Sequence, residues 1–459
     1  MRRVTPALAL GLCALLAASA PSYAGQGGHA TAAEGARDSY GTKASYQPEQ
    51  NPLTYQRAPK GYTAVFTENV SRHGSRAATD DEDGELVLQL WDKAEAAGQL
   101  TTLGQQFGPD VTALEAAMAK VGYGQLSGRG KDELTATADR LAQRLPGLFK
   151  TIADKGESID VVSSGQGRAV DSGTVFTNAL TTADPALKSS LGTARTDPDL
   201  LYFHKSAGGA AYQKWLASDE RLATTLKTLT DQPATHRSAA RVLKKIFKPA
   251  FVRQIVNGDY ASVADDVTAA QAVYNLYAID PAMRDESPGG KGWGMDKYIA
   301  KKDADWFGYL SDLEDFYEKG PSFADSDITY KMAGVLLDDF FKKAEAKRDG
   351  TSTLGAELRF THAEEIIPLA ALMRLPGSTK GVTASQPYTY ATNAWRGAQV
   401  SPMAANIQWD MYAKGNTYLV RMLYNEKETA FKAGCHPVRK GSYFYDLNEL
   451  ERCFGRTTS

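Results

Sequence analysis

Residues 62–76 read Tyr-Thr-Ala-Val-Phe-Thr-Glu-Asn-Val-Ser-Arg-His-Gly-Ser-Arg. The first nine alternate apolar and polar side chains, a pattern that predicts a β-strand. His73 follows with Arg72 and Arg76 close on either side, and guanidinium groups are rarely buried without partners. In open α/β sheets, ligands bind just beyond the carboxyl ends of the strands. The segment therefore predicts a ligand site built around His73.

His73 and its two arginines suit phosphoryl transfer. This reaction needs a nucleophile, positive charge spread over the phosphate oxygens, and a proton for the leaving alkoxide. A neutral imidazole can attack phosphorus, and Arg72 and Arg76 offer forked donors that fit phosphate and stay charged. Repulsion from both guanidinium groups lowers the pKa of His73 below its ordinary value of about 6.5, which keeps the lone pair available. We expect His73 to be the nucleophile.

A second polar segment, Thr361-His362-Ala363-Glu364, ends the predicted strand Glu357–Thr361 and opens a helical pattern. We expect His362 to donate to a phosphate. We expect Glu364 to act as the general acid, provided that apolar surroundings raise the pKa of its carboxyl group. The alternative is a buried, hydrogen-bonded histidine beside carboxylates that favour a helix N-terminus.

A third segment carries a lone cation. Arg168 comes after the predicted strand Ile159–Val162 and the mostly small residues 163–167. Such a cation suits an anion pocket, whereas the alternative is an ordinary surface arginine. Three strand ends thus each supply a histidine or an arginine in an otherwise acidic protein. This coincidence favours one shared phosphate site.

The order of the predicted elements indicates an α/β fold. Four runs are typical of strands: Tyr62–Val70, Ile159–Val162, Glu357–Thr361 and Tyr418–Tyr424. The first three are each followed by a turn-like segment and a helical pattern, and one apolar stripe runs through Leu134, Ala138, Leu141 and Leu145. A second helix should contain Pro368 within its first turn. Repetition of strand and helix is typical of layered α/β proteins.

Residues 185–350 differ because their pattern is almost wholly helical. The simplest organisation is a discontinuous α/β domain, residues 51–184 and 351–459, that carries a helical cap insertion at 185–350. Within the insertion, Lys244, Lys245 and Lys248 form a small basic cluster, which suits either a solvated helix face or contact with an anionic ligand.

The N-terminus has the pattern of a secretory signal. Two arginines precede an apolar stretch from Ala7 to Ala18, and Ser22-Tyr23-Ala24 predicts cleavage after Ala24. The alternative is an uncleaved helix at a membrane surface. Residues 25–50 are rich in Gly, Ala, Ser and Gln without an apolar period, so we expect a flexible leader and ordered structure from about Pro52. We therefore expect a secreted or periplasmic protein.

Two cysteines, Cys435 and Cys453, would remain after cleavage, because Cys13 lies in the removed stretch. In an exported chain we expect them to form one disulfide that pins the C-terminal tail. Two unpaired thiols are the alternative.

The composition excludes some classes of protein. Hydrophobic residues make up 42% and charged residues 23%, which is ordinary for a soluble globular protein. The formal charge of −2 becomes −4 without Arg2 and Arg3, which argues against a nucleic-acid binder. No segment after the signal is long and apolar enough for a membrane helix. An anionic small molecule remains a suitable partner, since a site needs only a local positive field.

Arg72-His73-Gly74-Ser75-Arg76 resembles the phosphohistidine motif of the histidine acid phosphatases, branch 2 of the histidine phosphatase superfamily. Residues 126–133 are similar to the next conserved element of that family, and residues 163–172 to the segment that supplies a further phosphate-binding arginine. His362-Ala363-Glu364, where many members have His-Asp, is similar to the multiple inositol polyphosphate phosphatase subfamily. Residues 404–407 and 423–426 also resemble C-terminal segments of that subfamily.

This resemblance implies a phosphoglycerate mutase-like fold, in which helices flank a central mixed sheet and form an inserted cap. It implies that His73 becomes phosphorylated and that Glu364 protonates the leaving oxygen. It also implies that the transferring phosphate is held by Arg72, Arg76, Arg168 and His362. The family uses no metal or other cofactor, and the remaining histidines show no ligand spacing. Residues 77–80 depart from the family's commonest continuation of the first motif.

The resemblance further implies the substrate, an inositol polyphosphate such as phytate, hydrolysed by a secreted phosphomonoesterase. Lys205 and Arg241, together with the basic cluster, are candidates for binding the additional phosphates. A broad-specificity phosphatase acting on sugar phosphates shares every named residue, so only substrate profiling separates the two. A phosphate-binding protein without catalysis is a third possibility, but it would be expected to lose the nucleophile or the acid, and both are present.

Overall fold

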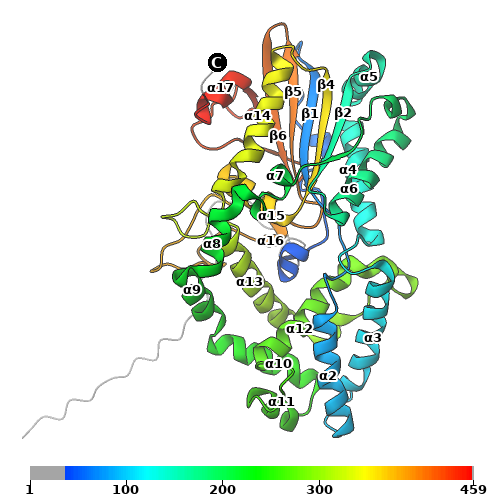
Figure 1. Cartoon of the computed structure of the whole chain (residues 1–459), viewed down its shortest axis with the longest axis vertical. Helices are drawn as coiled ribbons and strands as arrows, with labels where there is room; N and C mark the ends of the chain where they lie inside the picture. Colours follow the sequence, from blue (N-terminus) through cyan, green and yellow to red (C-terminus); the bar gives the residue numbers. More distant parts are fainter. Residues whose placement is uncertain (1–36, 457–459) are drawn as a thin grey trace, which may run out of the picture.

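A computed structural model describes residues 37–456, which contain one mixed sheet of eight strands. Figure 1 shows the sheet in one half of the elongated molecule and a group of helices in the other half. The strands follow the order β3-β2-β4-β1-β5-β6-β7 across the sheet, and β8 pairs with β6. Their bounds are β1 Thr63–Arg72, β2 Ser158–Ser163, β3 Arg195–Thr196, β4 Leu354–Thr361, β5 Asn406–Lys414, β6 Thr417–Tyr424, β7 Lys427–Thr429 and β8 Phe444–Asp446.

Strands β2, β4 and β1 are adjacent and parallel, and they end level with one another. Arg72 at the end of β1 lies opposite Thr361 at the end of β4, and Ser163 at the end of β2 lies opposite Phe360. The segments that follow these strands therefore emerge side by side at one edge of the sheet. On its other side β1 pairs with β5, which runs antiparallel. The predicted mixed sheet is confirmed.

Helices cover both faces of the sheet (Figure 1). On one face α4, α5 and α6 form a core that joins Leu141 and Phe176 to Leu358 of β4. On the other face α14 packs Phe340 against Trp409 of β5, with ring centroids 5.2 Å apart. The bounds of the flanking helices are α4 Gly128–Arg144, α5 Pro146–Lys155, α6 Gly167–Ala183, α14 Gly334–Arg348, α15 Ala363–Leu372 and α17 Leu447–Cys453.

Most of the remaining helices build the other half of the molecule, where α2 and α3 lie beside α10 and α12, whereas α7 contacts β4 and α14 in the sheet half (Figure 1). Their bounds are α2 Glu82–Ala96, α3 Gly104–Val121, α7 Pro198–Leu201, α8 Ala210–Ser218, α9 Glu220–Thr230, α10 Pro233–Ile246, α11 Pro249–Val256, α12 Asp266–Ile279, α13 Lys301–Glu318 and α16 Gly397–Val400. The division into a discontinuous α/β domain and a cap at 185–350 stays a prediction. Helices α2 and α3 lie outside residues 185–350 but contact the helical half. Helix α14 lies inside residues 185–350 but contacts the sheet.

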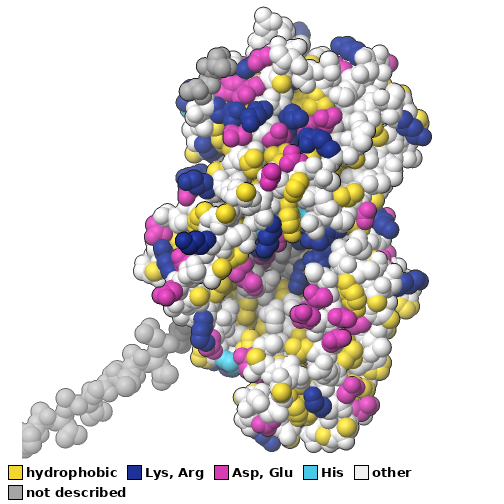
Figure 2. All heavy atoms as spheres, viewed as in Figure 1, with side chains coloured by type: hydrophobic (Ala, Val, Ile, Leu, Met, Phe, Trp, Pro, Cys, Tyr) yellow, Lys and Arg dark blue, Asp and Glu magenta, His cyan; other side chains and the backbone are white. Residues whose placement is uncertain are grey.

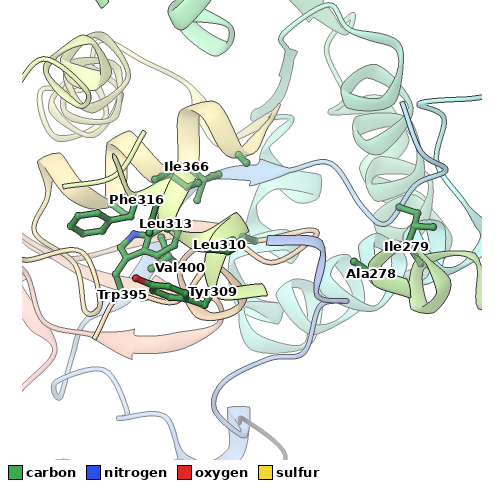
Figure 3. Packing of buried hydrophobic residues seen from close by; sticks show 14 of the residues in the cluster. Ala278, Ile279, Tyr309, Leu310, Leu313, Phe316, Ile366, Trp395 and Val400 are labelled. Carbon is green, nitrogen blue, oxygen red and sulfur yellow. The ribbon is translucent and has the colours of Figure 1, made fainter. Parts of the chain in front are cut away.

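Helix α13 connects the two halves through a shared apolar core. Figure 3 shows Leu313 and Phe316 of α13 near Trp395 and Val400, which lie in the segment before β5. The rings of Phe316 and Trp395 have centroids 6.0 Å apart, and both side chains are fully buried. Each such burial stabilises the fold by roughly 1.5–3 kcal/mol, so the core fixes α13 relative to the sheet.

The four predicted strands form as β1, β2, β4 and β6, with small shifts of their ends. Strand β5 was not predicted, although Ile407, Trp409 and Met411 recur at the period of two that marks a strand. The predicted place of Pro368 is wrong. It lies in the second turn of α15, where its missing N–H leaves the carbonyl of Glu364 without the usual helical donor.

Residues 37–50 of the expected flexible leader are ordered, which corrects that part of the prediction, while residues 25–36 lie outside the described residues. Asp38–Lys43 form a 3-10 helix, and the side chain of Tyr46 is buried. The backbone N–H of Tyr46 donates to Glu133 at 2.9 Å. The segment is fixed by backbone hydrogen bonds and a few single buried side chains. It therefore lacks the regular spacing of apolar residues by which a sequence indicates ordered structure.

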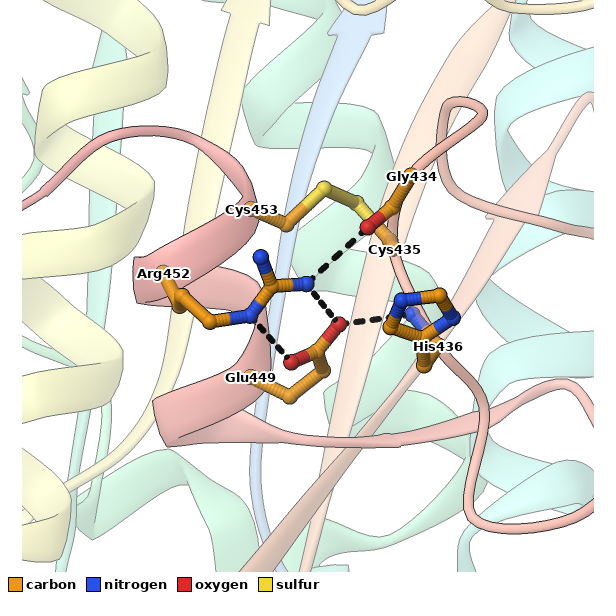
Figure 4. The surroundings of a disulfide bond; sticks show 6 residues. All are labelled: Gly434, Cys435, His436, Glu449, Arg452 and Cys453. Atoms are coloured by element: carbon orange, nitrogen blue, oxygen red, sulfur yellow. Dashed lines mark hydrogen bonds and ion pairs between the residues drawn. A yellow bond between two sulfur atoms is a disulfide. The ribbon is translucent and has the colours of Figure 1, made fainter.

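The predicted disulfide between Cys435 and Cys453 is present (Figure 4). It fastens the end of α17 to the loop before β8, and Arg452 adds hydrogen bonds to Glu449 and to the carbonyl of Gly434. Within the described part of the chain, no helix is long and apolar enough to cross a membrane. The predicted signal peptide, with cleavage after Ala24, lies outside the described residues.

Candidate active site

His73 lies just past β1, at the edge where the three parallel strands end. Its backbone N–H donates to the carbonyl of Thr361 at 2.9 Å. Its ring Nδ1 donates to the carbonyl of Gly74 at 2.9 Å, because a carbonyl can only accept, so the free lone pair is on Nε2. Burial, and then the charge of Arg72, hold the pKa of His73 well below its ordinary value. The imidazole is therefore neutral, as a nucleophile requires.

The loop after β1 packs backbone to backbone against the first turn of α4. A Cβ atom on Gly74 would lie 2.4 Å from the carbonyl oxygen of Gly130, and one on Gly130 would lie 2.0 Å from that of Ser75. Both positions therefore require glycine. Glu133, farther along α4, accepts hydrogen bonds from the backbone N–H and the hydroxyl of Ser75. The segment that the sequence linked to the first motif thus holds that motif in place.

Arg72, Arg76 and Arg168 have no carboxylate within ion-pair distance among residues 37–456. Arg72 donates to the backbone carbonyls of Thr42 and Ser401 at 2.6 and 2.5 Å. The Nε atom of each of the three arginines is buried without a partner in the described part of the chain. Burial, and then Arg168 and Arg72, lower the pKa of Arg76 to about 10. Crowded guanidinium groups without counter-ions indicate a site for an anion.

His362 faces His73 across the site, with ring centroids 5.4 Å apart. It stands at the N-terminus of α15, and its Nε2 shares a hydrogen bond of 2.8 Å with the hydroxyl of Ser164. Its Nδ1 is buried and has no partner among the described residues. Burial, and then the charge of Arg168, lower the pKa of His362 to about 3. A neutral ring with an unpartnered nitrogen suits the expected phosphate ligand.

Glu364 lies in the first turn of α15, and its surroundings correct the expectation of an apolar pocket. The Nζ atom of Lys319 is 3.5 Å from Oε1 of Glu364. Burial raises the pKa of this carboxyl group, but Lys319, a backbone N–H, His204 and Arg72 outweigh burial and hold the pKa below its ordinary value. Cations surround Glu364 where apolar groups were expected, so its carboxylate is ionised in this arrangement.

The structure thus brings together the side chains that the sequence singled out. Electrostatic contacts link His73 to Arg72, Arg76, Arg168 and His362. Glu364 lies within electrostatic range of Arg72 and Arg76. Figure 2 shows the surface hollowed between the sheet half and the helical half, with Lys and Arg side chains gathered there. The placement is observed, and the roles of these residues stay predictions.

Residues 66–425 match the family model described as histidine phosphatase superfamily (branch 2). The chain belongs to this superfamily. Multiple inositol polyphosphate phosphatase of Bifidobacterium longum, in its crystal structure with inositol hexasulfate, is 33% identical with a TM-score of 0.86, over 91% of this chain and 97% of that one. Multiple inositol polyphosphate phosphatase 1 of Gallus gallus is 24% identical over 92% of this chain and 93% of its own. The predicted family and the predicted phosphatase activity are confirmed.

A more distant relative shares the fold of this histidine phosphatase. The phytase of D. castellii is 15% identical and has a TM-score of 0.59, over 92% of this chain and 85% of that chain. This likeness supports the predicted arrangement of a mixed sheet flanked by helices.

Sequence reasoning missed several residues at the site of this histidine phosphatase. Lys319 stands at the C-terminus of α13, and nothing in its local sequence distinguishes it from other surface lysines. The ring of Tyr202 packs between His204 and His362, with centroid distances of 4.5 and 5.1 Å. Ser164, by contrast, lies within the quoted third segment, and its position one residue past β2 was a usable signal.

Three of the five cations proposed within the helical insertion have other partners, whereas Lys205 and Lys244 are exposed. Arg241 pairs with Asp303, while Lys245 and Lys248 donate to backbone carbonyls at 2.9 and 2.8 Å. Figure 1 places α10, which carries Arg241 and Lys245, away from the sheet. A closer cation comes from the N-terminal segment, since Lys43 lies within electrostatic range of Arg76.

A cavity of about 910 Å³ lies at the opposite end of β1 from His73, where Thr63 and Tyr412 contribute to its wall. None of the predicted site residues lines it. Arg144 and Arg421, which do, are both paired with Asp410. The cavity is therefore separate from the candidate active site. Among the described residues, no group of three or more His, Cys, Asp or Glu side chains is placed to hold a metal ion.

Proposed function

We propose that this histidine phosphatase hydrolyses inositol polyphosphates, including phytate, through a phosphohistidine on His73, and that it acts outside the cytoplasm. One observation carries the proposal. A neutral imidazole with a free Nε2 lies among three arginines that have no carboxylate partner in the described part of the chain. That arrangement combines a nucleophile for phosphorus with dispersed positive charge for the phosphate oxygens.

The reaction proceeds in two balanced steps. In the first, Nε2 of His73 attacks phosphorus, the bond from phosphorus to the ester oxygen breaks, and Glu364, which must take up a proton when the substrate binds, gives that proton to the ester oxygen. In the second, water attacks the phosphohistidine, Glu364 takes a proton from the water, and Nε2 leaves as neutral imidazole. The products are the free alcohol and inorganic phosphate.

The phosphate ligands are in position before the reaction begins. Arg72, Arg76 and Arg168 offer N–H groups to the oxygens that do not react, and these groups keep their charge at any working pH. The hydroxyl of Ser164 shares a hydrogen bond with Nε2 of His362. When Ser164 donates it, the ring proton is on Nδ1, the nitrogen that lacks a partner among the described residues and can donate to the phosphate. Donors that need no rearrangement stabilise the charge of the transition state effectively.

The substrate class is supported by the comparisons and by the charge of the site. The Bifidobacterium longum enzyme, similar over 91% of this chain, was crystallised with inositol hexasulfate, a ring that carries several anionic groups. Here Lys43 and Lys319 extend the positive field beyond the three arginines. Extra cations suit a substrate with phosphates next to the one that is cleaved.

Export is supported by two features. The first 24 residues have the charged start, apolar stretch and small-residue cleavage site of a secretory signal. The disulfide between Cys435 and Cys453 is of a kind that persists in oxidising compartments. Mass spectrometry of the mature protein, with Gly25 expected as its first residue, checks this part of the proposal.

Substrate profiling tests the activity. Purified protein is assayed for phosphate release from phytate, a sugar phosphate and an aromatic phosphate, and the inositol products are separated by chromatography. We expect the highest kcat/KM on phytate, with lower inositol phosphates as products. Faster turnover of the sugar phosphate with phytate untouched would support the broad-specificity alternative instead. Absence of release from all three would reject the proposal.

A further inference from the structure

Lys319 occupies an uncommon position between two carboxylates. It caps the C-terminus of α13, where its backbone N–H donates to the carbonyl of Asp315. Its Nζ donates to Oδ1 of Asp315 at 2.7 Å and lies 3.5 Å from Oε1 of Glu364. Asp315 is itself anchored, because Thr42 donates to its other oxygen at 3.0 Å. Lys319 therefore has one firm partner and one looser partner, and the looser partner is the candidate proton donor.

The pairing with Lys319 works against the role of Glu364. A carboxylate beside an ammonium group favours its ionised form, whereas a general acid must carry a proton. The other groups around Glu364 come from several segments. They include Arg72 at the end of β1, Arg76 in the loop after it, Tyr202 and His204 before α8, Tyr212 in α8, Glu318 at the end of α13, and His362 and Glu365 at the start of α15.

An anionic group beside the scissile phosphate can remove the conflict. The ammonium group of Lys319 sits on a flexible four-carbon stem, and its contact with Glu364 is longer than a hydrogen bond. A second phosphate on the same ring would attract this ammonium group while Asp315 keeps its hydrogen bond. Glu364 would then lose a cation and gain anionic neighbours, both of which favour its protonated form.

We propose that Lys319 is a positioning residue that couples protonation of Glu364 to the charge of the substrate. The inference rests on the proposed function. A substrate with a neighbouring phosphate draws Lys319 away from Glu364, and the carboxyl group takes up the proton that the leaving oxygen needs. A simple alkyl monophosphate leaves Lys319 on Glu364 and is cleaved slowly. Selectivity for polyphosphates then arises in the chemical step as well as in binding.

The variant Lys319→Met tests this coupling, because it removes the charge and keeps most of the side-chain volume. The kcat/KM is measured against pH for phytate and for glycerol 2-phosphate. With glycerol 2-phosphate, the pH above which kcat/KM falls should rise by about one unit or more, since a nearby cation no longer favours ionised Glu364. The ratio of kcat/KM for phytate to that for glycerol 2-phosphate should fall about tenfold, the change that one pKa unit produces.

Two control variants separate charge from structure. Lys319→Arg keeps the charge and should keep the wild-type pH profile and most of the selectivity. Lys301→Met removes an exposed ion pair with Asp305 at the other end of α13 and should change neither quantity. If Lys319→Met changes neither the pH above which kcat/KM falls nor the ratio of kcat/KM for the two substrates, the inference is overturned and the phosphatase proposal still stands. Failure of the wild-type protein to release phosphate from either ester would overturn the proposed function itself.

Proton uptake provides a second measurement that needs no Lys319 variant. Wild-type protein is titrated calorimetrically with inositol hexasulfate near neutral pH in two buffers of different ionisation enthalpy. Sulfate esters stay ionised at this pH, so protons taken up on binding must go to the protein. We expect an uptake approaching one proton, and a clear reduction in Glu364→Gln. Binding without proton uptake would contradict the coupling.

Discussion

Glu133 accepts two hydrogen bonds from Ser75, one from its backbone N–H at 2.8 Å and one from its hydroxyl at 2.9 Å. The N–H of Tyr46 donates to the same carboxylate at 2.9 Å. Because Glu133 is buried within α4, one side chain ties both the loop after β1 and the N-terminal segment to a helix on the face of the sheet. The position of His73 therefore depends on Glu133, which reaches His73 only through the loop that contains Ser75.

The first prediction concerns this link. Glu133→Ala leaves the N–H groups of Ser75 and Tyr46 buried without an acceptor, at a cost of about 1–3 kcal/mol for each group. A loop displaced by about 1 Å also reduces kcat, by about 10²-fold. Thermal unfolding and steady-state kinetics measure both effects. Glu95→Ala, an exposed change on α2, is the control, and a Glu133 variant as stable and active as this control would show that the link is unimportant.

The second prediction concerns the nucleophile. His73→Ala should lower kcat by about 10⁴-fold or more, because the covalent step is lost. The fold should remain, since within residues 37–456 the ring makes a single hydrogen bond, to the adjacent carbonyl of Gly74. A phosphohistidine is hydrolysed in acid. The reaction is therefore stopped in alkali after a short pulse of labelled substrate, and the label on the protein is measured. Label on the His73 variant, or substantial activity in a pure sample, would remove His73 from this role.

The central part of the site was predictable because its residues follow strands directly. Arg72, His73 and His362 each end or follow a run with a strand pattern, and parallel strands present such ends at one edge of the sheet. The residue types at these positions, a nucleophilic imidazole beside cationic guanidinium groups, then indicated phosphoryl transfer. The inference did not require knowing that β2, β4 and β1 are adjacent in the sheet. It required only the expectation that all three strands belong to one sheet.

Residues that reach the site through tertiary packing could not be predicted in the same way. Lys319 lies beside Glu364 only because the core around Phe316 and Trp395 holds α13 against the sheet. The N-terminal segment is ordered by backbone contacts such as that from Tyr46 to Glu133, which leave no periodic pattern. The pKa of Glu364 depends on these neighbours, which explains why an apolar pocket was expected and a cationic one was found.

The third prediction concerns the leaving group. Glu364→Gln should slow hydrolysis of alkyl phosphates by about 10²–10⁴-fold, because their leaving oxygen needs a proton as the bond breaks. An aromatic phosphate has a better leaving group and should be slowed far less. The two kcat/KM values are compared in the same preparation, with Glu318→Gln as a control from the nearby end of α13. Equal losses on both classes of substrate would remove Glu364 from the acid role.

The fourth prediction concerns the dependence of stability on pH. The pKa of His362 is about 3 in the folded protein, while an unfolded histidine titrates at about 6.5. Between these values the unfolded chain holds one more proton on this residue than the folded protein does. The free energy of unfolding therefore rises with pH in this window, and the stability that His362 contributes is lost as the pH falls. The contribution of this residue to the slope reaches about 1.4 kcal/mol per pH unit. His362→Asn does not titrate and should show a flatter profile across this window.

A second histidine supplies a control of opposite sign. Hydrogen bonds to Asp231 and Asp266 raise the pKa of His236, so its contribution is present at low pH and is lost as the pH rises through the raised value. His236→Asn should therefore lower stability more in acid than at neutral pH, the reverse of His362→Asn. Chemical denaturation from pH 4 to 8 compares the two slopes with that of the wild type. A His362 variant with an unchanged slope would mean that this ring is not held neutral in the folded protein.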